Sequence, residues 1–217
     1  MTPGHGPSEG MPGAAVWDER YRSQGQLWSG RPNPHLVSEA ADLTPGTALD
    51  AGSGEGADAI WLAEHGWQVT AVDFSTVALE RGAARARELG DEVARRITWQ
   101  HADLTDWGPP VASYDLVSAQ FMQLPSDQRE PLFRRLAAAV SPGGTLLIVG
   151  HHPSDLQTTV RRPRAPELFY TGADVAALLD PDGWDITVNA ARERSVTDSE
   201  GRPVLVHDTV LRARRRR

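Results

Sequence analysis

The sequence predicts an α/β fold of three layers, in which helices cover both faces of a mostly parallel, seven-stranded sheet that ends in an antiparallel hairpin. Strand-like and helix-like stretches alternate between residues 47 and 149, as in βα units around a parallel sheet. A glycine-rich loop joins the first strand of this series to the first helix. Two extended stretches, joined by Asp-Ser-Glu-Gly at 198–201, close the chain and predict the hairpin.

The individual elements follow from hydrophobic periodicity and from capping residues. Parallel strands are expected at 47–50, 68–72, 96–101, 114–119 and 145–149, with helices at 57–65, 76–89 and 126–140. The apolar run 145–149 is typical of a strand that is buried on both faces. Residues 151–171 predict an irregular insertion, followed by a helix at 172–179 and hairpin strands at 184–196 and 203–211.

The chain is expected to form a single domain over residues 14–211. Residues 1–13 hold four Gly and three Pro, which predicts a disordered leader. Residues 14–45 predict two short helices, the second starting at Pro34 after a cap at Asn33, and we expect them to form a lid over a bound cofactor. The basic tail, residues 212–217, is expected to be solvated and frayed.

The composition excludes several classes of function. The chain has no cysteine, which removes disulfides, thiolate metal sites and cysteine nucleophiles, and no metal is expected. It also has no lysine, which excludes Schiff-base chemistry and the phosphate loop of kinases and ATPases. The net charge of -7 argues against nucleic-acid binding and favours a small-molecule partner.

The chain shows no membrane-spanning run and no signal peptide, so we expect a cytoplasmic protein that does not enter a membrane. We expect a monomer or a weak homodimer.

The loop Gly-Ser-Gly-Glu-Gly at 52–56 lies where a strand ends and a helix begins. Gly52 and Gly54 let backbone N–H groups approach a ligand closely, because a Cβ atom at those positions would clash. About 20 residues later, Asp73 ends the second strand, where a carboxylate accepts the hydroxyl protons of an adenosine ribose. The loop also satisfies the dinucleotide pattern G-x-G-x-x-G/A, so by itself it leaves two cofactor classes open.

Residues 48–56, Ala-Leu-Asp-Ala-Gly-Ser-Gly-Glu-Gly, resemble motif I of the class I S-adenosylmethionine-dependent methyltransferases, and the resemblance covers about residues 16–211. Further matches are Asp73 at the ribose position, Ala102-Asp103-Leu104 at the adenine position and Ser-Pro-Gly-Gly at 141–144. Residues 17–21 and 27–34 are similar to the small-molecule branch that includes tellurite-resistance and thiopurine methyltransferases. The resemblance implies methyl transfer from S-adenosylmethionine to a small-molecule acceptor. It leaves the acceptor atom (sulfur, oxygen, nitrogen or a metalloid) open.

Two alternatives remain at this point, an NAD(P)-dependent Rossmann reductase and a non-catalytic sensor that binds S-adenosylmethionine and contacts a partner through the arginine tail. Methyl transfer is favoured over hydride transfer because the chain has no lysine for a Tyr-x-x-x-Lys pair and lacks a second domain for a substrate. The terminal hairpin also resembles the methyltransferase sheet, whose last strand is antiparallel to the others.

The cofactor carries a sulfonium and an ammonium group, which carboxylates and aromatic faces stabilise. The residues expected to bind it are Asp50, Gly52, Ser53, Gly54, Asp73, Phe74, Ala102, Asp103, Leu104, Ala119, Tyr21 and Trp28. Each acidic side chain has a structural alternative as the cap of a turn or helix, and each ring has one as simple packing.

Methyl transfer is a displacement at carbon, for which the enzyme mainly aligns the reactants and excludes water. The residues expected to line the acceptor pocket are Gln120, Phe121, Met122 and Trp17, for which core packing is the alternative. The sequence after the fourth strand differs from the Asn-Pro-Pro-Tyr type of loop, which makes DNA bases and glutamine side chains unexpected acceptors.

A phenol or amine acceptor also has to lose a proton. His151 and His152 follow the fifth strand at the carboxyl edge of the sheet and are the candidate bases, while a polar loop histidine without chemistry is the alternative. The arginines at 161, 162 and 164 are candidates for steering an anionic acceptor, against the alternative of a solvated loop.

Overall fold

The computed structural model describes residues 14–23, 30–160, 165–198 and 200–217. The expected leader, Trp28 and the arginines at 161, 162 and 164 therefore lie outside the described residues. Among the helices that are described, none is both long and apolar enough to cross a membrane.

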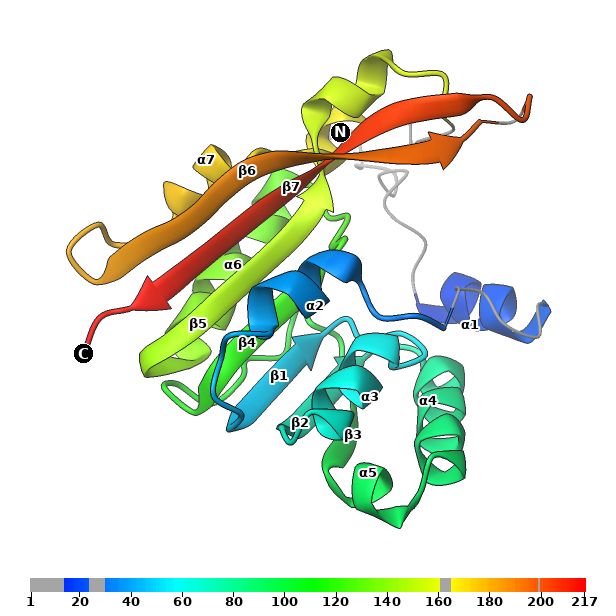
Figure 1. The fold of residues 1–217 in the computed structure, drawn as a ribbon, viewed down its shortest axis with the longest axis vertical. Helices are drawn as coiled ribbons and strands as arrows, with labels where there is room; N and C mark the ends of the chain where they lie inside the picture. The colour runs from blue at the N-terminus through cyan, green and yellow to red at the C-terminus, as the bar shows by residue number, and fades with distance from the viewer. Residues whose placement is uncertain (1–13, 24–29, 161–164, 199) are drawn as a thin grey trace, which may run out of the picture.

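Seven strands form one sheet in the order β3-β2-β1-β4-β5-β7-β6 (Figure 1). The strands β3, β2, β1, β4 and β5 pair in parallel, and β7 pairs antiparallel with both β5 and β6. The strands are β1 (Thr47–Ala51), β2 (Gln68–Asp73), β3 (Ile97–His101), β4 (Tyr114–Gln120), β5 (Val140–His151), β6 (Trp184–Thr197) and β7 (Pro203–Arg215). The predicted fold class, with its antiparallel hairpin at the carboxyl end, is confirmed.

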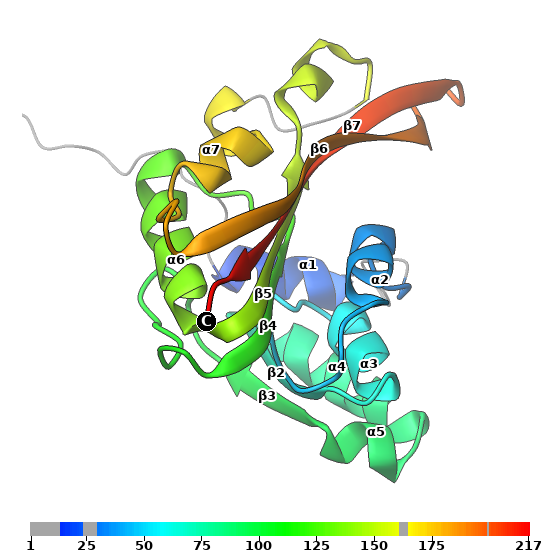
Figure 2. The same ribbon diagram turned by 60° about the vertical axis from the view of Figure 1, so that its left-hand side comes forward.

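Helices cover both faces of this sheet, as Figures 1 and 2 show. One face packs on α2 (Pro34–Ala40), α3 (Ala57–Glu64), α4 (Thr76–Glu88) and α5 (Asp91–Arg95). The other face packs on α6 (Ser126–Ala139) and α7 (Gly172–Ala176). The first helix, α1 (Ala14–Ser23), lies against α4, and two short 3₁₀ helices, η1 (Pro153–Gln157) and η2 (Pro166–Leu168), follow β5.

The two cores reflect the alternation of side chains along each strand. In β5, Leu146 and Ile148 belong to the core under α6, whereas Leu147 and Val149 belong to the core under α2 and α3. Because both faces of β5 are buried, its central run has no polar side chain that needs a partner. Alternation continues to His151, the last residue of β5, which shares the α2 face with Leu147 and Val149.

Several expected boundaries differ from the structure. The helix expected at 172–179 ends at Ala176, and α5 forms where no helix was predicted. The prediction of a frayed tail is wrong at residues 212–215, which pair with β5 and β6 as the end of β7. Ion pairs also hold this end of the chain against the domain. Arg212 pairs with Asp42 at 3.1 Å, and Arg216 pairs with Asp185 at 2.7 Å.

The hairpin β6–β7 continues beyond the rest of the sheet as a two-stranded arm (Figure 1). Pairing between β5 and β7 stops at His151 and Asp208, but pairing between β6 and β7 continues to Thr197 and Pro203. The segment after β5 packs on this arm, and the backbone N–H of His207 donates to Asp155 at 2.8 Å. The arm therefore stands next to the carboxyl edge of the parallel strands.

Candidate active site

The glycine loop between β1 and α3 is held by the neighbouring strand β2. The backbone N–H groups of Gly52 and Ser53 both donate to the carbonyl oxygen of Val72, at 2.8 and 3.0 Å. Gly52, Gly54 and Gly56 have φ angles of 77°, 53° and 74°. Because a side chain strains the backbone at such angles, the loop requires glycine at these positions.

Trp99 in β3 packs directly on this loop. Its ring fills the space next to Gly56 and Gly82, and a Cβ atom added to Gly82 would lie 2.6 Å from a ring carbon. The sequence interpretation missed Trp99. The available signal was Gly82, since a glycine inside a helical pattern often marks a close neighbour.

Asp73 ends β2 beside the glycine loop, as predicted. Its Oδ2 accepts the backbone N–H of Gly54 at 2.8 Å and its Oδ1 accepts the backbone N–H of Ser75 at 2.9 Å. Burial raises the pKa of this carboxyl, and these backbone hydrogen bonds partly offset the rise. Each carboxylate oxygen can accept a further hydrogen bond, which suits the two hydroxyl groups of a ribose.

Asp50 is 2% exposed at the end of β1, and its Oδ2 has no hydrogen-bond partner among the described residues. Burial raises the pKa of Asp50 well above its usual range, and the nearby carboxyls of Asp58 and Asp73 raise it further, while the backbone N–H of Ala59 lowers it. An unpaired buried carboxylate oxygen is costly, and a cationic ligand would offset that cost. The site therefore fits a ligand that carries positive charge.

A polar chain links the start of α2 to the carboxyl end of β4. The backbone N–H of Asn33 donates to Asp58 at 2.6 Å, and the side-chain amide of Asn33 donates to Gln120 at 2.8 Å. Gln120 in turn donates to Ser118 at 2.6 Å. Burial raises the pKa of Asp58 to about 6. The predicted cap at Asn33 is confirmed, whereas Asp58 and the link to Gln120 were not foreseen.

The helix α1 lies beside the acid at the end of β2. Asp18 accepts a hydrogen bond from the hydroxyl group of Ser75, which is the N-cap of α4 and follows Asp73 by two positions. Tyr21 is buried, with its ring centroid 6.2 Å from that of Trp17. Trp17 and Tyr21, which were both predicted to contact the cofactor or the acceptor, thus belong to a helix that lies near the predicted ribose site.

The segment after β3 also reaches Asp73, because the backbone N–H of Ala102 donates to the Asp73 carbonyl at 3.0 Å. Asp103, however, accepts the backbone N–H and the hydroxyl of Thr105 at 2.8 and 2.7 Å, as in a turn cap. The carbonyl of Phe74 accepts a hydrogen bond from His101 at 3.0 Å, and Leu104 is buried. The roles of these residues toward a cofactor stay predictions.

Phe121, directly after β4, has a φ of 52°, which is strained for an aromatic residue. Its backbone N–H donates to Val149 at 2.7 Å, and its ring centroid lies 4.7 Å from that of His151. Met122 packs against Gly52. The structure thus brings Phe121, Met122 and His151 to one edge of the sheet, together with the glycine loop.

The two candidate bases have different surroundings. His152 is the N-cap of η1, and its Nδ1 contacts the hydroxyl of Ser154 at 2.9 Å. His151 instead contacts Phe121, and its Nδ1 lies 3.9 Å from Asp208. The role of either histidine as a base stays a prediction.

Asp208 is a residue that the sequence interpretation missed. It is 1% exposed in β7 and contacts Arg194 at 2.6 Å and His35 at 3.1 Å. Burial raises the pKa of Asp208, but the neighbouring His151 and the hydrogen bonds from His35 and Arg194 outweigh burial and hold the pKa below its usual range. The four residues come from α2, β5, β6 and β7, so no local sequence pattern joins them.

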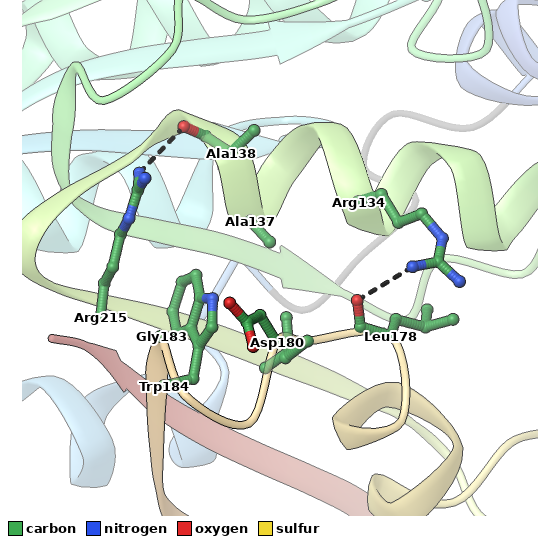
Figure 3. Close-up of a pocket in the computed structure, with 9 residues that line it drawn as sticks. Arg134, Ala137, Ala138, Leu178, Asp180, Gly183, Trp184 and Arg215 are labelled. Atoms are coloured by element: carbon green, nitrogen blue, oxygen red, sulfur yellow. Dashed lines mark hydrogen bonds between the residues drawn. The ribbon is translucent and has the colours of Figure 1, made fainter.

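A separate open pocket of about 320 Å³ lies at the other end of the sheet (Figure 3). Its lining includes Arg134, Asp180, Trp184 and Arg215. Arg134 donates to the carbonyl of Leu178 at 3.1 Å, as Figure 3 shows. Because Trp184 and Arg215 pair at the end of the hairpin away from Asp208, this pocket is remote from the glycine loop and its carboxylates.

This combination of sheet order, glycine loop and acid at the end of β2 resembles that of the class I S-adenosylmethionine-dependent methyltransferases. Residues 48–144 match the model of a family described as methyltransferase domain, and they span the loop, Asp73 and the strands β1 to β4. This part of the chain is therefore similar to a methyltransferase domain.

Curated relatives have methyltransferase names with varied acceptors. A ribosomal RNA small subunit methyltransferase C from Alcanivorax borkumensis is 30% identical over 49% of this chain and 33% of its own length. A 2-heptyl-1-hydroxyquinolin-4(1H)-one methyltransferase from Mycobacteroides abscessus is 27% identical over 56% of this chain and 54% of its own. A trans-aconitate 2-methyltransferase from Rhizobium meliloti is 31% identical over 54% of this chain and 43% of its own length. The chain thus spans from a third to about half of these relatives.

Solved structures resemble a larger part of the chain. The structure described as "Conversion of a Disulfide Bond into a Thioacetal Group during Echinomycin Biosynthesis" has a TM-score of 0.73 and 24% identity, covering 94% of this chain and 92% of that one. Magnesium protoporphyrin IX methyltransferase from Synechocystis, with bound SAH, has a TM-score of 0.61 and 21% identity, covering 93% of this chain and 84% of that one. At these identities the likeness supports the fold.

Proposed function

We propose that this chain transfers the methyl group of S-adenosylmethionine to a small-molecule acceptor. The observation that carries the proposal is the buried, unpartnered Oδ2 of Asp50 next to a glycine loop that a second acid, Asp73, holds in place. A carboxylate pair of this kind suits a cofactor with a cationic end and a ribose diol. Neighbouring structures include one with bound SAH, which supports the same cofactor class.

In this proposal Asp73 holds the ribose hydroxyls, and Asp50 faces the positive charge of the cofactor. When bound, S-adenosylmethionine supplies an electrophilic methyl carbon attached to a sulfonium. The remaining cofactor contacts are those expected from the sequence, namely Gly52, Ser53, Gly54, Phe74, Ala102, Asp103, Leu104, Ala119, Tyr21 and, outside the described residues, Trp28.

The acceptor is proposed to lie beside Phe121, Met122 and Trp17, with α1 and α2 as the lid. Support comes from the hydrogen bond between Asp18 of α1 and Ser75, and from the Asn33–Gln120 contact, which place both helices at the carboxyl edge. The net charge of -7 supports a small molecule over nucleic acid. A cytoplasmic location and a monomer or weak homodimer complete the proposal.

Calorimetric titration with S-adenosylhomocysteine and, separately, NADH tests the cofactor. We expect saturable binding of S-adenosylhomocysteine alone. Asp73→Asn should weaken it at least about tenfold, because a hydrogen bond to a charged group contributes about 1.5 kcal/mol or more. The matched control is Asp174→Asn, which alters a carboxylate that likewise accepts a backbone N–H, from Thr171 at 2.8 Å, but in the capping box of α7.

Two other outcomes would contradict the proposal. Binding of NADH would assign the loop to hydride chemistry. Binding of S-adenosylhomocysteine without turnover of S-adenosylmethionine on any phenol, thiol, amine, carboxylic acid or metalloid anion would favour the non-catalytic sensor.

A further inference from the structure

The open pocket shown in Figure 3 is built from three parts of the chain that are far apart in sequence. The last turns of α6 form one side, the segment 178–183 between α7 and β6 forms another, and Trp184 and Arg215 contribute the paired ends of β6 and β7. Its volume of about 320 Å³ is within the range of small-molecule sites in proteins. The pocket is therefore of a size that suits a small ligand.

Two arginines of the lining are only partly used by the fold. Nη1 of Arg134 donates to the carbonyl of Leu178 at 3.1 Å. Nη1 of Arg215 donates to the carbonyls of Ala138 and Val140, at 3.3 and 2.6 Å. A guanidinium group has five N–H donors, and within the part of the chain that the structure describes the other nitrogens of both groups have no hydrogen-bond or ion-pair partner. Each arginine therefore keeps N–H donors for a ligand.

The indole ring of Trp184 forms an apolar wall of the pocket. It belongs to the core under α6, and in Figure 3 its nitrogen is on the side of the ring that faces Asp180. Trp184 is 9% exposed, so a ligand meets part of the ring and not a full face. The side chain of Leu178 adds apolar surface to the same lining. A ligand with an apolar body and a charged end can thus contact a ring and a guanidinium together.

Positive charge exceeds negative charge around the pocket. Asp180 is the acidic residue of the lining, against the two arginines Arg134 and Arg215. The nearby pair of Arg216 and Asp185, at 2.7 Å, adds no net charge. The carboxyl end of α6 carries partial negative charge, but Arg215 caps its carbonyls. This local excess occurs in a chain whose net charge is -7, and it favours an anionic ligand.

We propose that this pocket is a second ligand site, for a small organic acid that places its carboxylate on the guanidinium of Arg134 and its apolar body against Trp184. Arg134 is the better anchor because it is exposed and holds a single carbonyl, whereas Arg215 holds the end of α6. Hydrogen bonds between a guanidinium and a carboxylate are charge-assisted and stronger than neutral ones. The proposal is independent of methyl transfer, since the pocket shares no residue with the glycine loop or with Asp50 and Asp73.

NMR of the indole N–H group of Trp184 in ¹⁵N-labelled protein tests the site, with benzoate as the probe and Trp184→Phe to assign the signal. We expect benzoate to shift this signal saturably. Benzamide, the neutral analogue, and sodium chloride at the same concentration should not. Arg134→Gln should weaken benzoate binding about tenfold or more, because a hydrogen bond to a charged group is lost. The matched control is Arg87→Gln, which should leave binding unchanged: Arg87 also donates to one backbone carbonyl, that of Ala83 at 3.0 Å, but from α4 on the other face of the sheet.

Asp180→Asn tests the sign of the charge. The variant removes the negative charge from the lining, and its amide oxygen still accepts the backbone N–H of Asp182, which donates to Asp180 at 3.0 Å. Benzoate should therefore bind several-fold more tightly to this variant. Weaker binding, or a shift of the Trp184 signal by benzylammonium in preference to benzoate, would indicate a pocket for cations and overturn the proposal.

The unaltered protein keeps the proposal falsifiable even where a variant fails to fold. No shift with benzoate, or an equal shift with benzamide or chloride, would overturn it, as would unchanged benzoate binding in a folded Arg134→Gln variant. S-adenosylhomocysteine should leave the benzoate shift unchanged. Displacement of benzoate by S-adenosylhomocysteine would mean that both bind at the glycine loop, and it would contradict a second site while supporting the proposed function.

Discussion

The terminal methyl group of Met122 lies 2.8 Å from the position that a Cβ atom would take on Gly52. Two features therefore require glycine at position 52, the first glycine of the loop. One is its positive φ, and the other is the side chain of Met122, which follows β4. This contact joins the proposed cofactor site to the proposed acceptor site, because Gly52 belongs to the first and Met122 to the second.

Gly52→Ala should accordingly lower the free energy of unfolding by about 2 kcal/mol or more, from backbone strain and overpacking together. It should also weaken binding of S-adenosylhomocysteine. Denaturant unfolding and calorimetry measure the two effects. The control is Gly201→Ala, since Gly201 has a φ of 79° with no atom within 4 Å of an added Cβ. That variant should show the strain of about 1 kcal/mol and normal binding; similar results for the two variants would contradict the role of Met122.

Asp58 makes stability depend on pH. Its folded-state pKa is raised from 3.8 to about 6 by burial, so its neutral form is favoured in the folded protein. The resulting stabilisation is complete below about pH 4 and is lost as pH rises through 6. Asp58→Asn should keep the hydrogen bond from the Asn33 N–H, since an amide oxygen also accepts. It should raise the melting temperature by several degrees at pH 8 and change it little at pH 4.

The opposite behaviour is expected for Asp174→Asn. Hydrogen bonds from the backbone and side chain of Thr171 lower the pKa of Asp174. Its ionised carboxylate therefore stabilises the folded state at neutral pH, and this stabilisation is lost in acid. Thermal unfolding between pH 4 and pH 8 measures the trend for Asp58→Asn, and thermal unfolding from pH 7 down to about pH 2 measures the trend for Asp174→Asn. Parallel trends in the two variants would mean that burial does not dominate at Asp58.

Trp99 and Gly82 should be energetically coupled. Gly82 lies inside α4, where alanine is normally better by about 1 kcal/mol. A Cβ there would lie 2.6 Å from the Trp99 ring, so Gly82→Ala should be destabilising in the natural sequence. In the background of Trp99→Ala, itself destabilising by about 3 kcal/mol, the same change should become neutral or stabilising. A double-mutant cycle by denaturant unfolding tests this, and strict additivity would contradict the contact.

Local patterns were enough to predict the parallel part of the fold. The glycine loop, the acid after β2 and the cap at Asn33 each depend on residues close together in sequence, and each lies where it was expected. The cluster around Asp208 was not predicted, because His35 and Asp208 are 173 positions apart and meet only through the order of the strands. Asp58 was not predicted as part of the site, because its hydrogen-bond partner Asn33 belongs to another element.

The arginine-rich end of the chain was misjudged because charge alone was considered. Arginine is typical of a solvated tail, but the alternation Leu-Arg-Ala-Arg at 211–214 also fits a strand with one buried face. Leu211 and Ala213 are fully buried, while Arg212 reaches Asp42 at 3.1 Å. The hydrophobic period was therefore the better guide.

Removal of residues 212–217 should consequently destabilise the whole domain. The deletion takes away the pairing of β7 with Thr145–Leu147 and with the start of β6, the buried side chain of Ala213 and the ion pair between Arg216 and Asp185 at 2.7 Å. We expect a large fall in melting temperature or insoluble protein. Removal of Arg217 alone, which lies beyond the end of β7 and packs near Gly143, is the control and should change little. If the protein without residues 212–217 melted like the full chain, the end of β7 would contribute nothing to stability, and the frayed tail would be the better description.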